Sequence, residues 1–189
     1  MSTELTPTAR VILGMLRLGA RTGYDIKRAI DGSTRFFWTA SYGQIYPELR
    51  RLEERGLVKA RSDPRGGVKR TSYTLTTSGE EALAEWLTDE ESFIFELRDE
   101  QLLRFFFGDL MSREQVVANL RAQQRFCEDV LERFGAMEPQ ARTGFMDDAQ
   151  LYPYLALRHG IELMAWRRDW CERTANAIEA GELPPPLTG

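Results

Sequence analysis

The sequence predicts a mainly α-helical protein, in which a winged helix-turn-helix domain is followed by an α-helical dimerisation domain. Three observations predict this fold class. Three short helical patterns within residues 7–55 precede two β-rich segments joined by a Gly-rich turn. The second half shows long helical patterns with apolar spacings that alternate between three and four. Finally, residues 1–79 carry 14 Lys and Arg against 7 Asp and Glu, whereas the remainder carries 11 against 22.

The composition is that of an ordinary globular chain. Of the 189 residues, 42% are hydrophobic and 29% are charged, with a net charge of −4. No apolar run reaches the ~18 residues of a membrane-spanning helix, and the N-terminus lacks a signal-peptide pattern, so we expect a cytoplasmic protein that does not bind membranes. Cys127 and Cys171 match no metal-ligand spacing and His159 is the only histidine. We therefore expect neither an enzyme, a metal site nor a cofactor.

The first half begins with two short helices. The first is predicted over residues 7–18, because Thr6 is a good N-cap residue and Pro7 suits the first helical position. The second is predicted over residues 24–30 and ends at an Asp-Gly pair. The aromatic run Phe36–Trp38 is too short to form a helix, and we expect it to fill the small core.

The third helix is predicted over residues 41–55. Its apolar residues Ile45, Leu49 and Leu52 share one face. Pro47 lies close to the predicted start, where a kinked or 3₁₀ first turn accommodates a proline.

A β-hairpin is predicted after the third helix. Residues 57–61 and 71–75 have the character of strands, and the tip between them, residues 63–67, is rich in turn-forming residues. Because an isolated ribbon needs something to pack on, we expect the three helices to support it. Three helices followed by a basic hairpin make a helix-turn-helix unit with a β-wing.

The second half is predicted to be helical. A pattern that begins at Ser78 has a possible break near residues 88–92 and then continues to Gly108. Ser112 is expected to cap the next helix, with Gln115 in the capping-box position. We expect the seams of the long helices to be buried against a partner chain and to form the dimer interface. The seam positions are Val117, Leu120, Gln124, Cys127, Leu131 and Phe134 in the helix after Ser112, and Leu157, Ile161, Met164, Arg168 and Cys171 in the last helix. A seam shifted by one residue stays open as the alternative.

These patterns predict three regions. Residues 1–85 form the winged helix-turn-helix, DNA-binding domain, and residues 86–182 form a coiled-coil-like dimerisation domain. The tail, residues 183–189, contains three consecutive prolines and is expected to be disordered.

Several segments carry a resemblance to a known family. They are GYDI at 23–26, FW at 37–38, SYGQIYPELRRLE at 41–53, GLV at 56–58, and the strand exit at 70–79. They are similar to the PadR family of bacterial transcriptional regulators. The weaker pieces at 103–110 and 154–166 resemble the virulence-activator-like C-terminal domain of one subgroup. The resemblance implies a homodimer that binds a pseudo-palindromic DNA operator, with the C-terminal helices forming the dimer interface. Family habit favours a repressor.

The DNA-contacting residues are expected on three elements. The start of the third helix would lie in the major groove, where Gln44 could pair with adenine N6 and N7. For Tyr46, an inward position beside Ile45 stays open. The residues assigned to DNA contact are Ser41, Tyr42, Gln44, Tyr46 and Arg50 of the third helix, Lys27 and Arg28 of the second helix, and Arg65, Lys69 and Arg70 of the wing.

A small aromatic effector is a further candidate partner. The aromatic residues considered for its pocket are Trp86, Phe93, Trp166 and Trp170, which serve equally well as ordinary core residues. Two other functions stay open: an interaction adaptor whose winged helix binds protein instead of DNA, and a drug-binding protein without an operator. The positive charge of residues 1–79 and the polar side chain of Gln44 favour DNA.

Overall fold

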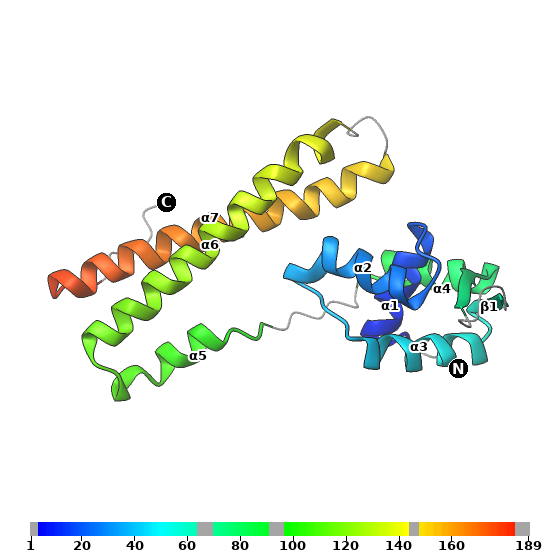
Figure 1. The fold of residues 1–189 in the computed structure, drawn as a ribbon, viewed down its shortest axis with the longest axis horizontal. Coiled ribbons are helices and arrows are strands. Elements are labelled where there is room, and N and C mark those ends of the chain that lie inside the picture. The colour runs from blue at the N-terminus through cyan, green and yellow to red at the C-terminus, as the bar shows by residue number, and fades with distance from the viewer. Residues whose placement is uncertain (1–3, 64–69, 91–96, 144–147, 184–189) are drawn as a thin grey trace. The chain divides into compact units, whose positions relative to one another are not determined.

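The structure is a computed structural model, and it describes residues 4–63, 70–90, 97–143 and 148–183. The chain divides into two compact units, Met1–Phe95 and Glu96–Gly189. The first unit contains short helices and a two-stranded sheet, and the second is dominated by two long helices (Figure 1). The predicted domain boundary between residues 85 and 86 lies within helix α4. That boundary stays a prediction.

Three helices open the first unit: α1 (Pro7–Arg17), α2 (Gly23–Gly32) and α3 (Tyr42–Glu54). The predicted cap is present, because the Thr6 hydroxyl oxygen accepts a hydrogen bond from the backbone N–H of α1 at 3.1 Å. Thr22 forms a capping box at the start of α2. Local sequence therefore defines where these helices begin.

The wing consists of β1 (Val58–Asp63) and β2 (Arg70–Leu75), which pair in antiparallel register from Val58 with Leu75 to Asp63 with Arg70. The backbone N–H of Tyr73 donates to the carbonyl oxygen of Arg21 at 2.7 Å, and this bond ties β2 to the loop between α1 and α2. The helices thus support the ribbon as predicted.

Helix α4 (Thr77–Thr88) closes the first unit. Its core contribution is Leu83, which is buried. The side chains at the centre of this core come from α1, α2 and α3 and are fully buried: Ile12, Leu13, Ile26, Ile30, Ile45, Leu49 and Leu52.

The aromatic run after α2 does not fill this core, so that prediction is wrong. Phe36 ends the short 3₁₀ helix η1 (Thr34–Phe36), and Phe37 and Trp38 follow it. Their exposed fractions are 41%, 64% and 36%, respectively. The isoleucines and leucines of the three helices already occupy the interior, so the three rings of this run remain at the surface.

The second unit contains α5 (Glu100–Phe106), the short η2 (Gly108–Leu110), α6 (Arg113–Thr143) and α7 (Asp148–Ala180). Helices α6 and α7 lie side by side (Figure 1). The predicted cap of α6 is present, because Ser112 N–H donates to Gln115 Oε1 at 2.8 Å. None of the described helices is long and apolar enough to cross a membrane.

Helix α5 begins later than the sequence pattern indicated. The carboxylate of Asp99 accepts from the N–H groups of Gln101 and Leu102, at 3.0 and 3.1 Å, and so caps the helix at Glu100. The same carboxylate forms an ion pair with Arg167 of α7. The acidic cap therefore both starts α5 and fastens it to α7.

The face of α6 that packs inward differs from the predicted seam by one residue at two places. Gln123 and Val130 are buried, whereas the predicted Gln124 and Leu131 are only half-buried. Leu120, Cys127 and Phe134 of the predicted seam are also buried, but within the single chain, and their place in a dimer interface stays a prediction. Similar side chains stand at neighbouring positions along α6, so its own pattern is compatible with either phase, and packing against α7 selects one.

The two cysteines meet the predicted role of small core residues. Cys127 of α6 and Cys171 of α7 are fully buried and free of disulfides. Burial raises the pKa of both thiols, that of Cys171 to about 11. Both therefore remain protonated and unreactive near neutral pH.

Candidate nucleic-acid interface

Helix α3 presents two distinct faces. Ile45, Leu49 and Leu52 are fully buried, and Glu48 is 5% exposed. The remaining side chains of the first two turns are exposed, with the exception of the half-buried Pro47. The outward residues that the sequence analysis assigned to DNA contact are Ser41, Tyr42, Gln44, Tyr46 and Arg50.

A buried carboxylate holds α3 against α1. The hydroxyl of Thr6 donates to Glu48 Oε1 at 2.7 Å, and Arg51 donates to Glu48 Oε2 at 3.1 Å. The Thr6 hydroxyl oxygen also accepts the capping bond of α1. One hydroxyl therefore links the start of α1 to the middle of α3, which sets the orientation of the helix.

Two tyrosines form a stacked pair on the outward face. The rings of Tyr42 and Tyr46 have centroids 6.1 Å apart and an interplanar angle of 20°. Tyr46 is 42% exposed, and its ring covers Gly23, where an added Cβ would lie only 2.6 Å from Tyr46 Cε1. Tyr46 thus neither enters the core beside Ile45 nor projects freely.

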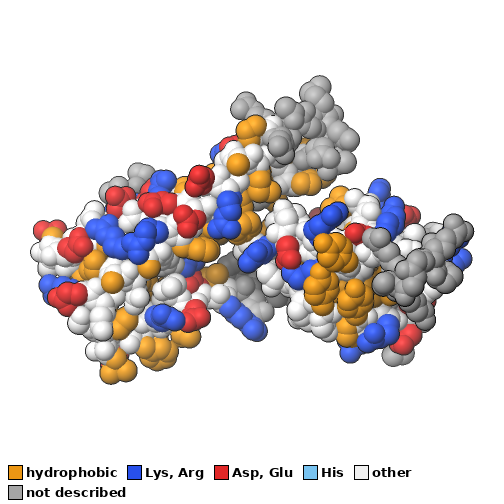
Figure 2. Space-filling model, viewed as in Figure 1, with side chains coloured by type: hydrophobic (Ala, Val, Ile, Leu, Met, Phe, Trp, Pro, Cys, Tyr) orange, Lys and Arg blue, Asp and Glu red, His pale blue; other side chains and the backbone are white. Residues whose placement is uncertain are grey.

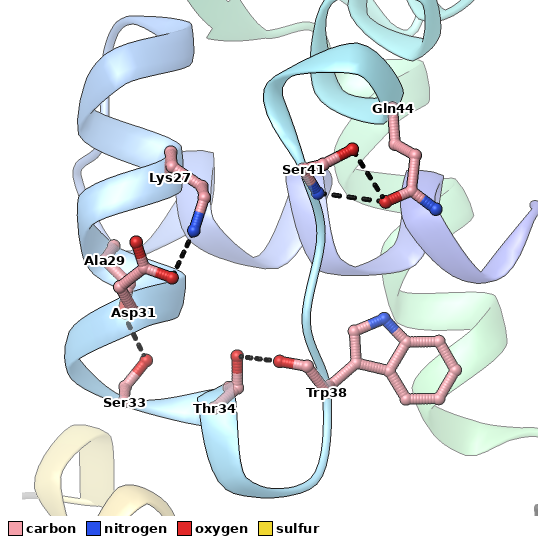
Figure 3. Close-up of polar contacts among 8 residues, drawn as sticks. All are labelled: Lys27, Ala29, Asp31, Ser33, Thr34, Trp38, Ser41 and Gln44. Atoms are coloured by element: carbon pink, nitrogen blue, oxygen red, sulfur yellow. Dashed lines mark hydrogen bonds and ion pairs between the residues drawn. The ribbon is translucent and has the colours of Figure 1, made fainter. Parts of the chain in front are cut away.

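The first turn of α3 is held by its own side chains. Gln44 Oε1 accepts from the backbone N–H of Ser41 at 2.9 Å and from the Ser41 hydroxyl at 3.1 Å (Figure 3). The N–H of Gln44 donates to the Ser41 carbonyl, a 3₁₀-type bond at 3.0 Å. The N–H of Ile45 donates to the same carbonyl at 2.9 Å, an α-helical bond, and Pro47 lies inside the helix as its sixth residue, beyond the first turn in which it was expected.

The two basic residues assigned on α2 differ in availability. Lys27 forms an ion pair with Asp31 one turn later, and its side chain is 22% exposed (Figure 3). Arg28 is exposed. A phosphate would have to compete with Asp31 for Lys27, so Arg28 is the better candidate.

Of the three wing residues assigned to DNA contact, the structure describes only the backbone of Arg70. Arg65 and Lys69 lie outside the described residues, as does the pocket candidate Phe93. The backbone of Arg70 pairs with that of Asp63 in the sheet. These residues keep their assignments as predictions.

Two exposed residues of the first unit were missing from the sequence-based set. Tyr24, in the first turn of α2, is 56% exposed, and Arg61 on β1 is exposed. Tyr24 stands off the apolar face that Ile26 and Ile30 define, so helical periodicity was the signal that could have found it. On the face of the first unit turned to the viewer in Figure 2, hydrophobic side chains gather beside Lys and Arg side chains.

A separate groove of about 470 Å³ lies in the first unit. Arg10 of α1 lies over the ring of Trp86, 5.3 Å from its centroid. The groove is lined mainly by apolar and aromatic side chains from α1, α4 and the segment after α2: Pro7, Val11, Met15, Leu18, Phe37, Trp38 and Trp86. Of the predicted pocket residues, Trp86 belongs here. Trp170 instead packs edge-on against Phe105 in the second unit, where Trp166 is also found.

Comparison with known proteins agrees with both units. Residues 12–85 match the model of the transcriptional regulator PadR-like family, and residues 97–179 match that of the virulence activator alpha C-terminal domain. The chain is 36% identical to the negative transcriptional regulator PadR of Bacillus subtilis over 89% of its own length and 95% of that protein. The chain belongs to the PadR-like family of transcriptional regulators.

Solved structures of PadR proteins share the whole fold. The B. subtilis PadR in complex with operator DNA has a TM-score of 0.80 at 28% identity, covering 90% of this chain and 96% of that one. The same protein in complex with p-coumaric acid has a TM-score of 0.71 at 26% identity, covering 92% and 98%. These likenesses confirm the predicted winged helix and helical C-terminal region. Together with the family match, they identify the chain as a transcriptional regulator and not an enzyme.

Proposed function

We propose that this PadR-like regulator acts as a homodimer that binds a pseudo-palindromic DNA operator and represses transcription. The observation that carries the proposal is the geometry of α3. Its apolar face and the Glu48 anchor fix the helix, while Ser41, Tyr42, Gln44 and Arg50 remain exposed on the other side. A rigid helix with exposed polar and aromatic side chains near its N-terminus suits entry into the major groove.

Charge supports the same proposal. Residues 1–79 carry a net charge of +7, from 14 basic and 7 acidic residues, whereas residues 80–189 carry −11. Basic and acidic side chains are interspersed over the second unit in Figure 2. DNA phosphates attract the basic residues 1–79. The six acidic residues between positions 80 and 91 also belong to the first unit, which therefore carries a net charge of +1, and the second unit carries −5. The B. subtilis relative is a negative transcriptional regulator, which favours repression.

The dimer part of the proposal is supported by apolar surface on the second unit. The exposed residues that a second copy could cover include Leu102, Leu103, Phe106, Phe107, Leu110 and Trp166. The single chain already covers Leu120, Cys127, Phe134 and Cys171. The half-buried remainder of the predicted interface is Val117, Gln124, Leu131, Leu157, Ile161, Met164 and Arg168. We expect these and the exposed residues to meet the partner copy.

The test combines oligomeric state, DNA binding and transcription. The purified protein should sediment as a dimer, shift a duplex from the region upstream of its own gene, and reduce transcription from that region in vitro. The double variant Tyr42→Ala/Arg50→Ala should lose the shift, as should Arg65→Ala/Lys69→Ala. Arg104→Ala, at an exposed position of α5, is the control and should bind normally. A monomer that ignores every duplex at low salt overturns the proposal and favours a protein-binding adaptor.

We further propose that a small aromatic acid relieves repression. The relative's complex with p-coumaric acid supports this chemistry, and the groove beside Trp86 offers aromatic walls with the guanidinium of Arg10 among its lining groups. Titration with p-coumaric acid should quench tryptophan fluorescence and release the duplex. Trp86→Phe should reduce the quenching, whereas Trp170→Phe, in the second unit, should not. Unchanged fluorescence and DNA binding at saturating acid would remove the effector from the proposal.

A further inference from the structure

The side-chain oxygen of Gln44 already has two hydrogen-bond donors within the chain. Its Oε1 accepts two hydrogen bonds from Ser41, one from the backbone N–H at 2.9 Å and one from the hydroxyl at 3.1 Å. Its Nε2 points away from Ser41 in Figure 3 and has no hydrogen-bond partner among the described residues. Gln44 itself is exposed on the outward face of α3.

The orientation of this amide follows from the chemistry of its partner. A backbone N–H can only donate, so the atom of Gln44 that faces the Ser41 N–H must be the oxygen. The nitrogen is then the atom that reaches outward with two hydrogens. The start of α3 therefore presents a hydrogen-bond donor and hides the corresponding acceptor.

We propose that Gln44 reads the operator only as a donor, through Nε2. Guanine presents two acceptors in the major groove, O6 and N7, and thymine presents O4, whereas adenine presents N7 beside an N6 donor that a donor-only amide leaves unsatisfied. The base contacted is therefore guanine or thymine. The two-bond contact with adenine that the sequence suggested is disfavoured, since Oε1 would have to accept from the adenine N6 amine. This inference rests on the proposed DNA-binding function and adds a specificity rule to it.

The balance of hydrogen bonds decides between the two contacts. An adenine contact through both amide atoms would take Oε1 away from the Ser41 N–H and hydroxyl, which lie at the protein–DNA contact where water is excluded. A capping interaction and a new hydrogen bond are of similar strength, so the exchange yields little. A donor-only contact keeps the cap and adds a bond.

Selection of bound duplexes from a random pool tests this rule. The wild-type protein should select guanine or thymine at one position of each half-site. Gln44→Glu retains the cap, because a Glu carboxylate accepts from Ser41 N–H equally well, but it has no donor. That variant and Gln44→Ala should lose the preference at that single position by about tenfold to a hundredfold while keeping the rest of the motif.

The chain supplies a matched control. Gln115 plays the same capping role at the start of α6, where Ser112 N–H donates to its Oε1 at 2.8 Å. Gln115→Glu should leave the selected motif unchanged at every position. Base preference is the readout, because the added negative charge of Gln44→Glu weakens binding to all duplexes through phosphate repulsion.

Two outcomes overturn the rule while leaving the proposed function intact. The first is selection of adenine at the Gln44-dependent position, with wild-type binding weakened when the N6 amine is removed by substituting purine. The second is an unchanged motif in both Gln44 variants. If the wild-type protein enriches no duplex at all, the proposed DNA-binding function itself fails.

Discussion

At the scale of single residues, Gly43 has no structural reason to be glycine. It is the second residue of α3, its φ is not positive, and the only atom near an added Cβ would be Ser41 Oγ at 3.7 Å. Glycine is costly in a helix relative to alanine. Because Gly43 lies next to Tyr42 and Gln44, our hypothesis is that its missing side chain lets DNA approach this backbone closely.

We therefore expect Gly43→Ala to separate stability from binding. The free energy of unfolding should rise by up to about 1 kcal/mol, because alanine favours the helix. Operator affinity should fall about tenfold, since the methyl group separates α3 from the DNA. Thermal unfolding and a duplex titration measure the two effects. A variant that is stabilised and binds as tightly as the wild type would show that Gly43 does not contact DNA.

Glu48 is the residue on which the position of α3 depends. Glu48→Ala removes the acceptor of the Thr6 hydroxyl and the partner of Arg51 from a buried site. We expect the free energy of unfolding to fall by about 1–3 kcal/mol. Glu48→Gln keeps an acceptor for Thr6 and should lose less. Urea unfolding compares the two variants, and equal losses would contradict the role of the Thr6 bond.

At the scale of elements, the junctions between helices and strands depend on close backbone contacts. Thr76 caps α4 through the N–H of Gly79 at 3.1 Å, and its hydroxyl donates to the Gly56 carbonyl at 2.7 Å. A Cβ on Gly79 would lie 2.0 Å from the carbonyl oxygen of Leu57. Both the cap and the missing side chain let α4 approach the base of the wing.

Two glycine-to-alanine substitutions should consequently have opposite effects. Gly79→Ala should destabilise the first unit by about 1–3 kcal/mol, because the Leu57 backbone must move to make room. Gly135→Ala, at an open helical position of α6, should stabilise the protein by about 0.5–1 kcal/mol. Denaturant unfolding of both variants provides the comparison. Destabilisation of similar size in both would mean that helix propensity and crowding at Gly79 are not what distinguish them.

The elements also show how far sequence patterns reach. Caps and apolar periodicity predicted α1, α3, the hairpin and the start of α6, because those signals act between residues three or four apart along the chain. The phase of the α6 seam was predicted only in part. Gln123 and Val130 are buried because α7 packs on that side, and a sequence pattern within α6 contains no information about this choice.

At the scale of the whole molecule, the positive charge is concentrated in residues 1–79. The net +7 of residues 1–79 and the −11 of residues 80–189 predict binding that depends strongly on salt. If the dimer makes about six to ten phosphate contacts, its operator affinity should fall by roughly 10³–10⁵ between 50 and 200 mM salt.

Substituting single arginines should show how much each one contributes to the salt dependence of operator binding. Arg28→Ala and Arg50→Ala should each reduce the slope of log affinity against log salt by about 1, for every phosphate contact removed. Arg104→Ala, paired with Glu100 in the second unit, should leave the slope unchanged. Duplex titrations at several salt concentrations measure the slopes. Equal slopes in all four proteins would show that neither Arg28 nor Arg50 touches phosphate.

Sequence alone determined the fold class and the succession of the helices and the wing, because each depends on local periodicity, caps and charge, whereas it left the position of Tyr46 on α3 open. The tertiary structure decided the rest. It left Phe36, Phe37 and Trp38 on the surface and buried Gln123 and Val130 on α6. The Lys27–Asp31 ion pair and the Ser41–Gln44 cap join residues three or four apart, so local sequence patterns contained the signal for both. The position of the aromatic run and the phase of α6 depend on which side chains already fill the core, and that is settled only when the elements pack.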